Sequence, residues 1–136
     1  MTHLDTSFLF KLYVVELDSA TAIAKFGLLS GPAAISNLSD VEMATSFYRK
    51  LPVAQAQRCY ANYRADESQG VLQRVDLSAA VYQLAGSLAG QYAATFKLRS
   101  LDTLQLATAL HYGATVLGTY DDRLKRAAQA AGLAIL

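Results

Sequence analysis

Residues 100–136 read SLDTLQLATALHYGATVLGTYDDRLKRAAQAAGLAIL, and this stretch decides the fold. Its apolar residues recur first at helical spacing, then in a short run bounded by turn residues, and then the pattern repeats. The predicted elements are, in order, helix Leu101–Tyr112 closed by Gly113, strand Ala114–Thr119, helix Leu124–Ala131 closed by Gly132, and strand Leu133–Leu136. Short strands that alternate with helices predict an α/β domain around a mainly parallel sheet.

The rest of the chain continues this alternation. Met1–Leu4 is a first strand, and the apolar residues from Phe8 to Val15 (Phe8, Leu9, Leu12, Val15) form a helical face. The remaining predicted elements are helix Ala20–Leu29, strand Ala33–Leu38, helix Val41–Lys50 capped by Ser39 or Asp40, helix Val53–Asp66, strand Val71–Leu77 and helix Ala79–Phe96 capped by Ser78, with Ser100 as the cap of the helix after it. No linker or internal repeat interrupts the chain, so residues 1–136 are expected to form one domain.

The composition of the 136 residues excludes several classes of protein. Hydrophobic residues make up 53% and charged residues 17%, enough to bury a core and too apolar for a disordered chain. The net charge of +1 argues against binding nucleic acid by bulk electrostatics, but not against an enzyme with a local acidic site. The single cysteine, Cys59, excludes an intramolecular disulfide and a cysteine-rich zinc site. No signal peptide or membrane-length apolar run is visible, so we expect a cytoplasmic protein without a membrane partner.

Four acidic residues stand where strands end or helices begin: Asp5, Glu42, Asp102 and Asp121. Such positions lie along one edge of a parallel sheet, so the four carboxylates are expected to converge there. Each acid alone also suits a helix N-terminus, where it would be only a structural cap. Converging carboxylates repel one another unless a cation lies among them, and an all-oxygen set favours Mg²⁺ or Mn²⁺. A metal-dependent phosphodiesterase follows from this arrangement.

Four segments resemble those of PIN-domain nucleases, in order and over nearly the whole chain. They are LDTSFL at 4–9, SNLSDVE at 36–42, RSLDTLQLATAL at 99–110 and TYDDRL at 119–124. The length and the single compact domain resemble most the VapC-type toxins of bacterial toxin–antitoxin pairs. The resemblance implies a PIN-like three-layer α/β/α sandwich with a short, mainly parallel central sheet.

The resemblance also implies an endoribonuclease in which Asp5, Glu42, Asp102 and Asp121 hold Mg²⁺ or Mn²⁺, and a metal-activated water attacks the RNA phosphodiester. The implied polar helpers are Ser7 and Thr119, and Arg99 is a possible RNA contact. The implied partners are an RNA substrate, a cognate antitoxin and a second copy in a homodimer. The apolar stretch Phe8–Val15 is a candidate part of the antitoxin groove, although core packing explains most of it.

The family pattern decides between neighbouring acids. It selects Asp121 over Asp122, which is then expected to cap or solvate the last helix, and Glu42 over Asp40. Two other functions remain open: a PIN-domain nuclease of RNA processing outside a toxin pair, and a non-catalytic PIN-like module that binds RNA or a partner. The intact acids argue against the second. A haloacid-dehalogenase-type phosphatase or a receiver domain fits poorly, because Asp5-Thr6-Ser7 lacks the second acid that either would need.

Overall fold

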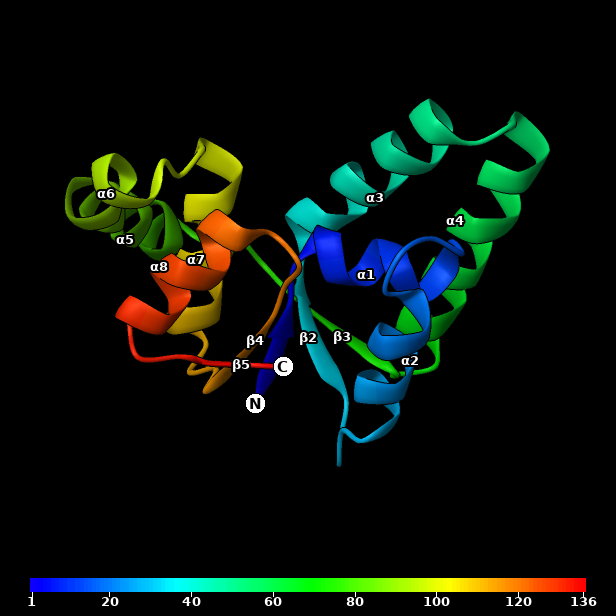
Figure 1. Cartoon of the computed structure of the whole chain (residues 1–136), viewed down its shortest axis with the longest axis horizontal. Coiled ribbons are helices and arrows are strands. Elements are labelled where there is room, and N and C mark those ends of the chain that lie inside the picture. The colour runs from blue at the N-terminus through cyan, green and yellow to red at the C-terminus, as the bar shows by residue number, and fades with distance from the viewer.

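The computed structural model describes all 136 residues and contains one sheet of five strands, every neighbouring pair of which is parallel. The strands lie in the order β3-β2-β1-β4-β5 (Figure 1). Their bounds are β1 Thr2–Leu4, β2 Ala33–Ser36, β3 Leu72–Val75, β4 Val116–Gly118 and β5 Ala134–Ile135. The chain runs outward on one side of β1 and then returns to its other side. The reversal between β1 and β4 is where open α/β sheets bind ligands, beyond the carboxyl ends of the strands.

Helices cover both faces of the sheet, which confirms the predicted three-layer sandwich. One layer holds α1 Thr6–Tyr13, α2 Ser19–Gly27, α3 Asn37–Lys50 and α4 Val53–Ser68. The other holds α5 Ala79–Leu88, a π-helical turn Ala89–Ala93, α6 Ala94–Phe96, α7 Ser100–His111 and α8 Asp122–Ala130. No helix is long and apolar enough to cross a membrane.

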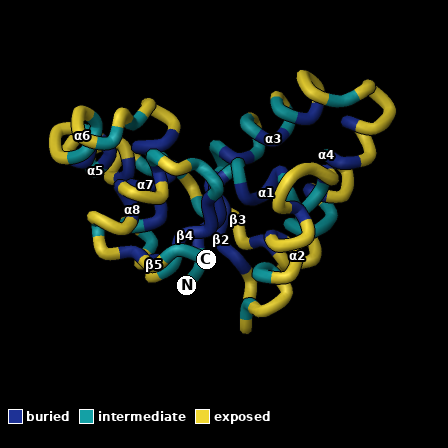
Figure 2. Tube along the Cα trace, viewed as in Figure 1, coloured by how far each residue is buried: buried dark blue, intermediate teal, exposed yellow.

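A separate hydrophobic core lies on each face of the sheet. Phe8, Phe47 and Tyr63 are fully buried in the first, and Leu106 and Leu124 in the second. Figure 2 shows the buried positions gathered along the sheet and the inner faces of the helices, with exposed positions on the outer turns. Each fully buried side chain of this size contributes about 1.5–3 kcal/mol, so the two cores hold the strand ends in fixed positions.

The first helix is shorter than the apolar pattern predicts. It ends at Tyr13, and Val14 takes extended backbone angles while its N–H still donates to Phe10 O. Val15 is therefore 97% exposed, and its predicted place on the buried face is wrong. The turn that follows is held by the Ser19 hydroxyl, which donates to Val14 O, so side-chain hydrogen bonding ends the helix before the apolar pattern does.

The boundary between β2 and α3 also differs from the prediction. The strand stops at Ser36 and the helix begins at Asn37, so Ser39 and Asp40 lie inside the helix instead of capping it. Within the helix, Asp40 accepts hydrogen bonds from the Tyr63 hydroxyl and from Arg74. Tertiary contacts therefore override the preference of an aspartate for the cap. As a result, Glu42 lies in the second turn of α3 and not in the first.

The two predicted helix stops at glycines are confirmed. Gly113 has φ 72° and Gly132 has φ 91°, the left-handed region that favours glycine. Ala114 N–H donates to Ala109 O after α7, which satisfies a carbonyl at the end of that helix. Ser78 caps α5 as predicted, with its hydroxyl accepting from Val81 N–H. The cap of α7, however, is Arg99 and not Ser100.

Candidate active site

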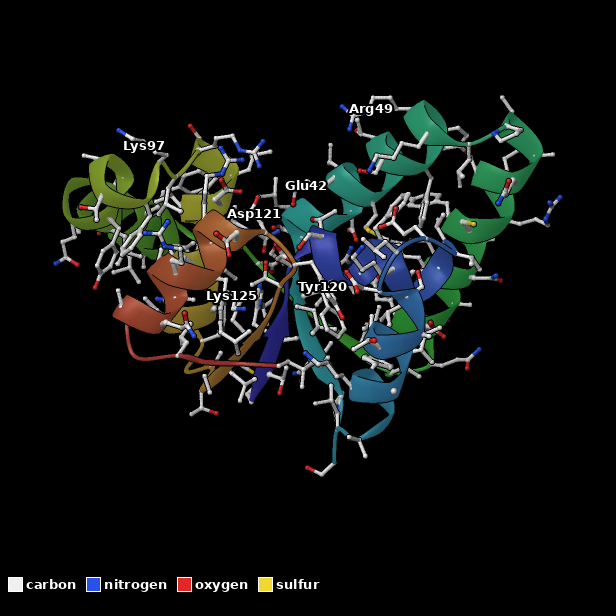
Figure 3. All side chains as sticks on the ribbon, in the orientation of Figure 1. Glu42, Arg49, Lys97, Tyr120, Asp121 and Lys125 are labelled. Carbon is white, nitrogen blue, oxygen red and sulfur yellow. The ribbon has the colours of Figure 1, made fainter.

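The four acids predicted from the sequence line one cavity of about 130 Å³. Asp5 follows β1, Glu42 projects from α3, Asp102 lies in the first turn of α7, and Asp121 follows β4. The remaining lining residues are also polar: Thr6, Ser7, Arg99 and Gln105. In Figure 3, Glu42 and Asp121 come from opposite helical layers and lie near each other above the sheet. The predicted convergence at the carboxyl edge of the sheet is confirmed.

Asp5 lies deepest in this group and is held on both carboxylate oxygens. Its Oδ1 accepts from Ser7 Oγ at 2.7 Å and from Phe8 N–H at 3.1 Å, and its Oδ2 accepts from Thr119 Oγ1 at 2.9 Å. Burial, with a smaller contribution from the charge of Glu42, raises the pKa of Asp5 to about 7 against the opposing effect of the three hydrogen bonds. Asp5 is therefore both the N-cap of α1 and a desolvated carboxylate that forms no ion pair with a lysine or arginine.

Glu42 is oriented by two residues that the sequence reasoning missed. Its Oε2 accepts from Thr6 Oγ1 at 2.6 Å and from Gln105 Nε2 at 2.8 Å. The amide oxygen of Gln105 contacts His3 Nε2 at 3.0 Å and accepts from the Ser36 hydroxyl at 3.3 Å. One available signal is that Gln105 lies three residues after Asp102 on a helix, so both side chains share a face.

His3 is fully buried on the central strand and contacts the active site only through Gln105. Burial lowers the pKa of His3 to about 4, while its hydrogen bond to Gln105 acts in the opposite direction, so the ring is neutral at pH 7. Since the Gln105 amide nitrogen donates to Glu42, the amide oxygen is the group that faces the ring, and His3 Nε2 is the donor. His3 thereby fixes which way the Gln105 amide points.

Arg99 links the remaining two acids. Asp102 Oδ2 accepts from Arg99 N–H at 3.0 Å and from Arg99 Nε at 3.2 Å. Arg99 Nη2 donates to Asp121 Oδ2 at 3.3 Å. The hydrogen bond to Asp102 and the charges of both aspartates raise the pKa of Arg99. With a side chain that is 64% exposed, Arg99 offsets two carboxylates and still reaches solvent.

Asp121 itself caps the last helix, so of the two roles predicted for Asp122, capping or solvation, the structure supports only solvation. Asp121 Oδ1 accepts from Arg123 N–H at 2.9 Å and from Leu124 N–H at 3.0 Å. Asp122 is the first residue of α8 and is exposed outside the cavity. Only residues 119–121 separate the end of β4 from the start of α8. One carboxylate therefore satisfies the helix with Oδ1 and faces Arg99 with Oδ2.

The chain matches the PIN-domain family model over residues 3–130. It belongs to the PIN-domain family. Two curated relatives from Mycobacterium tuberculosis are similar over their whole length. Ribonuclease VapC35 is 32% identical over 143 residues, which cover 100% of this chain and 96% of the relative. Ribonuclease VapC46 is 34% identical over 136 residues, which cover 98% of this chain and 95% of the relative.

Solved structures share the fold of this PIN domain. The M. tuberculosis toxin VapC20, which cleaves the sarcin-ricin loop, superposes with a TM-score of 0.80 at 18% identity over 98% of this chain and 96% of its own. The toxin–antitoxin complex VapBC2 from Rickettsia felis, bound to promoter DNA, gives a TM-score of 0.73 at 19% identity over 99% of this chain and 96% of its own. At these identities the likeness concerns the fold alone.

The polar helpers expected of a PIN domain, Ser7 and Thr119, both contact Asp5. Ser7 Oγ also accepts from Tyr120 N–H at 2.8 Å, and Thr119 Oγ1 accepts from Asp121 N–H at 3.0 Å. The two hydroxyls therefore tie the loop after β4 to the end of β1. They keep the carboxylates of Asp5 and Asp121 on the same side of the sheet.

The donor set of this PIN domain fits a hydrated hard cation. No three of its acidic, histidine or cysteine side chains are close enough together to enclose an ion by themselves. Mg²⁺ needs no such cage, because it is commonly bound through one or two carboxylates and keeps several waters. The cavity offers four carboxylates and no sulfur or imidazole, and the carboxylate of Asp5 is buried. These features suit Mg²⁺ or Mn²⁺ and are unlike a zinc site.

Proposed function

We propose that this PIN-domain protein is an Mg²⁺- or Mn²⁺-dependent endoribonuclease and the toxin of a VapBC-type toxin–antitoxin pair. The observation that carries the proposal is the all-polar cavity, whose walls include four acids from separate segments of the sequence, Asp5, Glu42, Asp102 and Asp121. Sequence relatives named as ribonucleases, which match this chain from end to end, support RNA as the substrate.

The residues of the cavity would have separate roles in binding the metal, orienting its ligands and binding the RNA. A divalent metal, when bound, supplies an activated water and polarises the phosphodiester. The residues that would hold it are the four carboxylates of the cavity, Asp5, Glu42, Asp102 and Asp121. Thr6 and Gln105 fix the orientation of Glu42. The exposed guanidinium of Arg99 would exchange part of its contact with carboxylates for a phosphate oxygen of the RNA.

The test is cleavage of structured cellular RNA by purified protein, with Mg²⁺ or Mn²⁺ and with EDTA. We expect cleavage with either metal, none in EDTA, and none from the Glu42→Gln variant, which keeps the hydrogen-bonding shape of the side chain. Single-stranded DNA of matching sequence is the substrate control. Undiminished cleavage in EDTA by protein free of other nucleases would overturn the metal role, and absence of cleavage under all conditions would favour the non-catalytic module.

We propose that the antitoxin covers the exposed apolar side chains around the α1–α2 turn. Phe8, Leu9 and Phe10, from the stretch suggested for the groove, are buried in the core, so they are not available to a partner. Val15 and Leu17 are instead 97% and 82% exposed. Contiguous exposed apolar side chains mark interaction surfaces, and we assign these two, two residues apart in the chain, to the surface that the antitoxin covers.

Co-expression with the product of the adjacent gene tests the antitoxin proposal in the cytoplasm, where we expect this protein to act. The molar mass measured by light scattering then tests both the complex and the homodimer. A stable complex that is lost in a Val15→Asp, Leu17→Asp variant supports the toxin role. A nuclease that forms no such complex would instead favour RNA processing outside a toxin pair.

A further inference from the structure

A second cavity adjoins the acidic one. It has a volume of about 290 Å³, and Thr6 and Ser7 line both. Its other walls come from α1, the turn after it, the last turns of α3 and the loop after β4. Those walls carry two lysines, Lys11 and Lys50, and one acid, Glu16. The charge of the cavity is therefore opposite in sign to that of the acidic cavity next to it.

Lys11 presents a positioned ammonium group. Its Nζ donates to Glu16 Oε1 at 3.0 Å and to Leu17 O at 2.7 Å, and it lies 5.0 Å from the centre of the Tyr120 ring. The side chain is only 12% exposed, so little conformational freedom remains to be lost when a ligand binds. An ammonium has three N–H donors, and two of them have these partners. The third is left for a ligand in the cavity.

Lys50 supplies a charge that no carboxylate of the protein neutralises. It is the last residue of α3, and its Nζ lies 4.4 Å from the centre of the Phe10 ring. Its ammonium forms no ion pair in the structure, whereas Lys11 is paired with Glu16. The Ser46 hydroxyl on the cavity wall adds a polar group that can donate to an anion, whereas the Ser7 hydroxyl already donates to Asp5. Two lysines and one hydroxyl against one acid suit a singly charged phosphodiester.

The cavity on the other side of the active site has a different character. It is larger, about 440 Å³, and is reached past Arg99, but most of its lining is apolar and Arg99 is its only cation. The Lys11–Lys50 cavity therefore offers more positive charge to a backbone phosphate that leaves the acidic cavity than the apolar cavity beyond Arg99 does. Contacts to phosphates set the register of a nucleic acid on a protein without reading its sequence.

We propose that Lys11 and Lys50 bind an RNA backbone phosphate that flanks the one being cleaved. The inference rests on the proposed ribonuclease function and adds the direction in which the RNA strand runs. The RNA would pass from the acidic cavity over Thr6 and Ser7 and then between α1 and α3. Because Thr6 and Ser7 line both cavities, the Lys11–Lys50 cavity would hold the next phosphate along the strand. Lys11 and Lys50 are binding residues in this scheme and take no part in the cleavage chemistry.

The test is binding of a short, labelled, single-stranded RNA of mixed sequence, followed by fluorescence anisotropy over a series of salt concentrations. The protein carries Glu42→Gln and Mg²⁺ is present, so that the RNA stays intact. Lys50→Gln is the main variant, since Lys50 is exposed and forms no ion pair whose loss would disturb folding. Lys11→Gln is the second. The matched control is Arg49→Gln, a neighbouring exposed cation on α3 that does not line the cavity (Figure 3).

We expect Lys50→Gln to weaken RNA binding about 3- to 10-fold and to reduce the slope of log K against log salt by about 0.7, the value for one contact to a single-stranded phosphate. Arg49→Gln should leave that slope unchanged. Equal slopes for Lys50→Gln, Lys11→Gln and the control, with cleavage by the parent intact, would overturn this subsite and leave the proposed function standing. A parent that neither binds nor cleaves RNA would overturn both. Normal RNA binding with loss of the antitoxin complex would assign the cavity to a protein partner and overturn the RNA subsite.

Discussion

Replacing the buried carboxylate of Asp5 by an amide should stabilise the metal-free protein, and by more at high pH than at low pH. Burial raises the pKa of Asp5 from the ordinary aspartate value of about 3.9 to about 7. Between these values the folded protein binds a proton that the unfolded chain has lost. The free energy of unfolding therefore falls as pH rises through this window, and Asp5→Asn removes the loss.

The size of the effect follows from the shift in pKa. One pKa unit corresponds to about 1.36 kcal/mol, so the charge costs the fold roughly 4 kcal/mol at pH 8 and roughly 1–2 kcal/mol at pH 5. The hydrogen bonds to Ser7, Phe8 and Thr119 have counterparts in asparagine, because its amide oxygen accepts and its NH₂ donates to a hydroxyl. The stability advantage of Asp5→Asn should thus be about 2–3 kcal/mol larger at pH 8 than at pH 5.

The assay is urea unfolding of the parent and Asp5→Asn in EDTA at pH 5 and pH 8. Asp122→Asn is the matched control, since it removes an exposed carboxylate from the neighbourhood of the cavity. Its effect should be small and nearly the same at both pH values. A variant less stable than the parent at pH 8, or an advantage that does not change with pH, would refute the reasoning and leave Asp5 as a helix cap only.

Substitutions at three further places test other parts of the account. Asp121→Ala should abolish cleavage and lower the free energy of unfolding by about 0.5–2 kcal/mol because a helix cap is lost, whereas Asp121→Asn should abolish cleavage with little loss of stability. Asp122→Ala should keep a cleavage rate within a few-fold of the parent, and kinetics and thermal unfolding of the three variants test these expectations. Gln105→Met removes the donor to Glu42, so Mn²⁺ affinity measured by calorimetry should fall about 10- to 100-fold, and an unchanged affinity would contradict its orienting role. Gly118→Ala would bring a methyl group into Leu4, so thermal unfolding should reveal a loss of about 1–3 kcal/mol; a neutral result would show that the strand can shift.

The positions of the four acids could be predicted because they depend on topology more than on detail. Asp5 and Asp121 each follow a strand, and parallel strands present their carboxyl ends at one edge whatever the precise length of each element. Glu42 was placed one turn too early, at the start of a helix that in fact begins at Asn37. The prediction survived that error because Glu42 still points to the same edge.

The contacts that orient the acidic side chains could not be predicted from the sequence. Gln105 carries no charge and belongs to no recognised metal pattern, yet it contacts Glu42 and His3. The two roles of Asp121 could not be predicted either. The sequence shows only that an aspartate precedes a helix, and not that one of its carboxylate oxygens caps the helix while the other faces Arg99. Such roles depend on side-chain directions that periodicity does not encode.

The central claim is that the carboxylates around the acidic cavity hold the metal on which RNA cleavage depends. The most direct measurement titrates Mn²⁺ into metal-free protein and follows ion binding and the rate of RNA cleavage in the same samples. We predict that the two rise together with one midpoint, and that Glu42→Gln weakens binding and abolishes cleavage. Cleavage at full rate before any Mn²⁺ binds, or an unchanged Mn²⁺ midpoint in Glu42→Gln, would contradict the account.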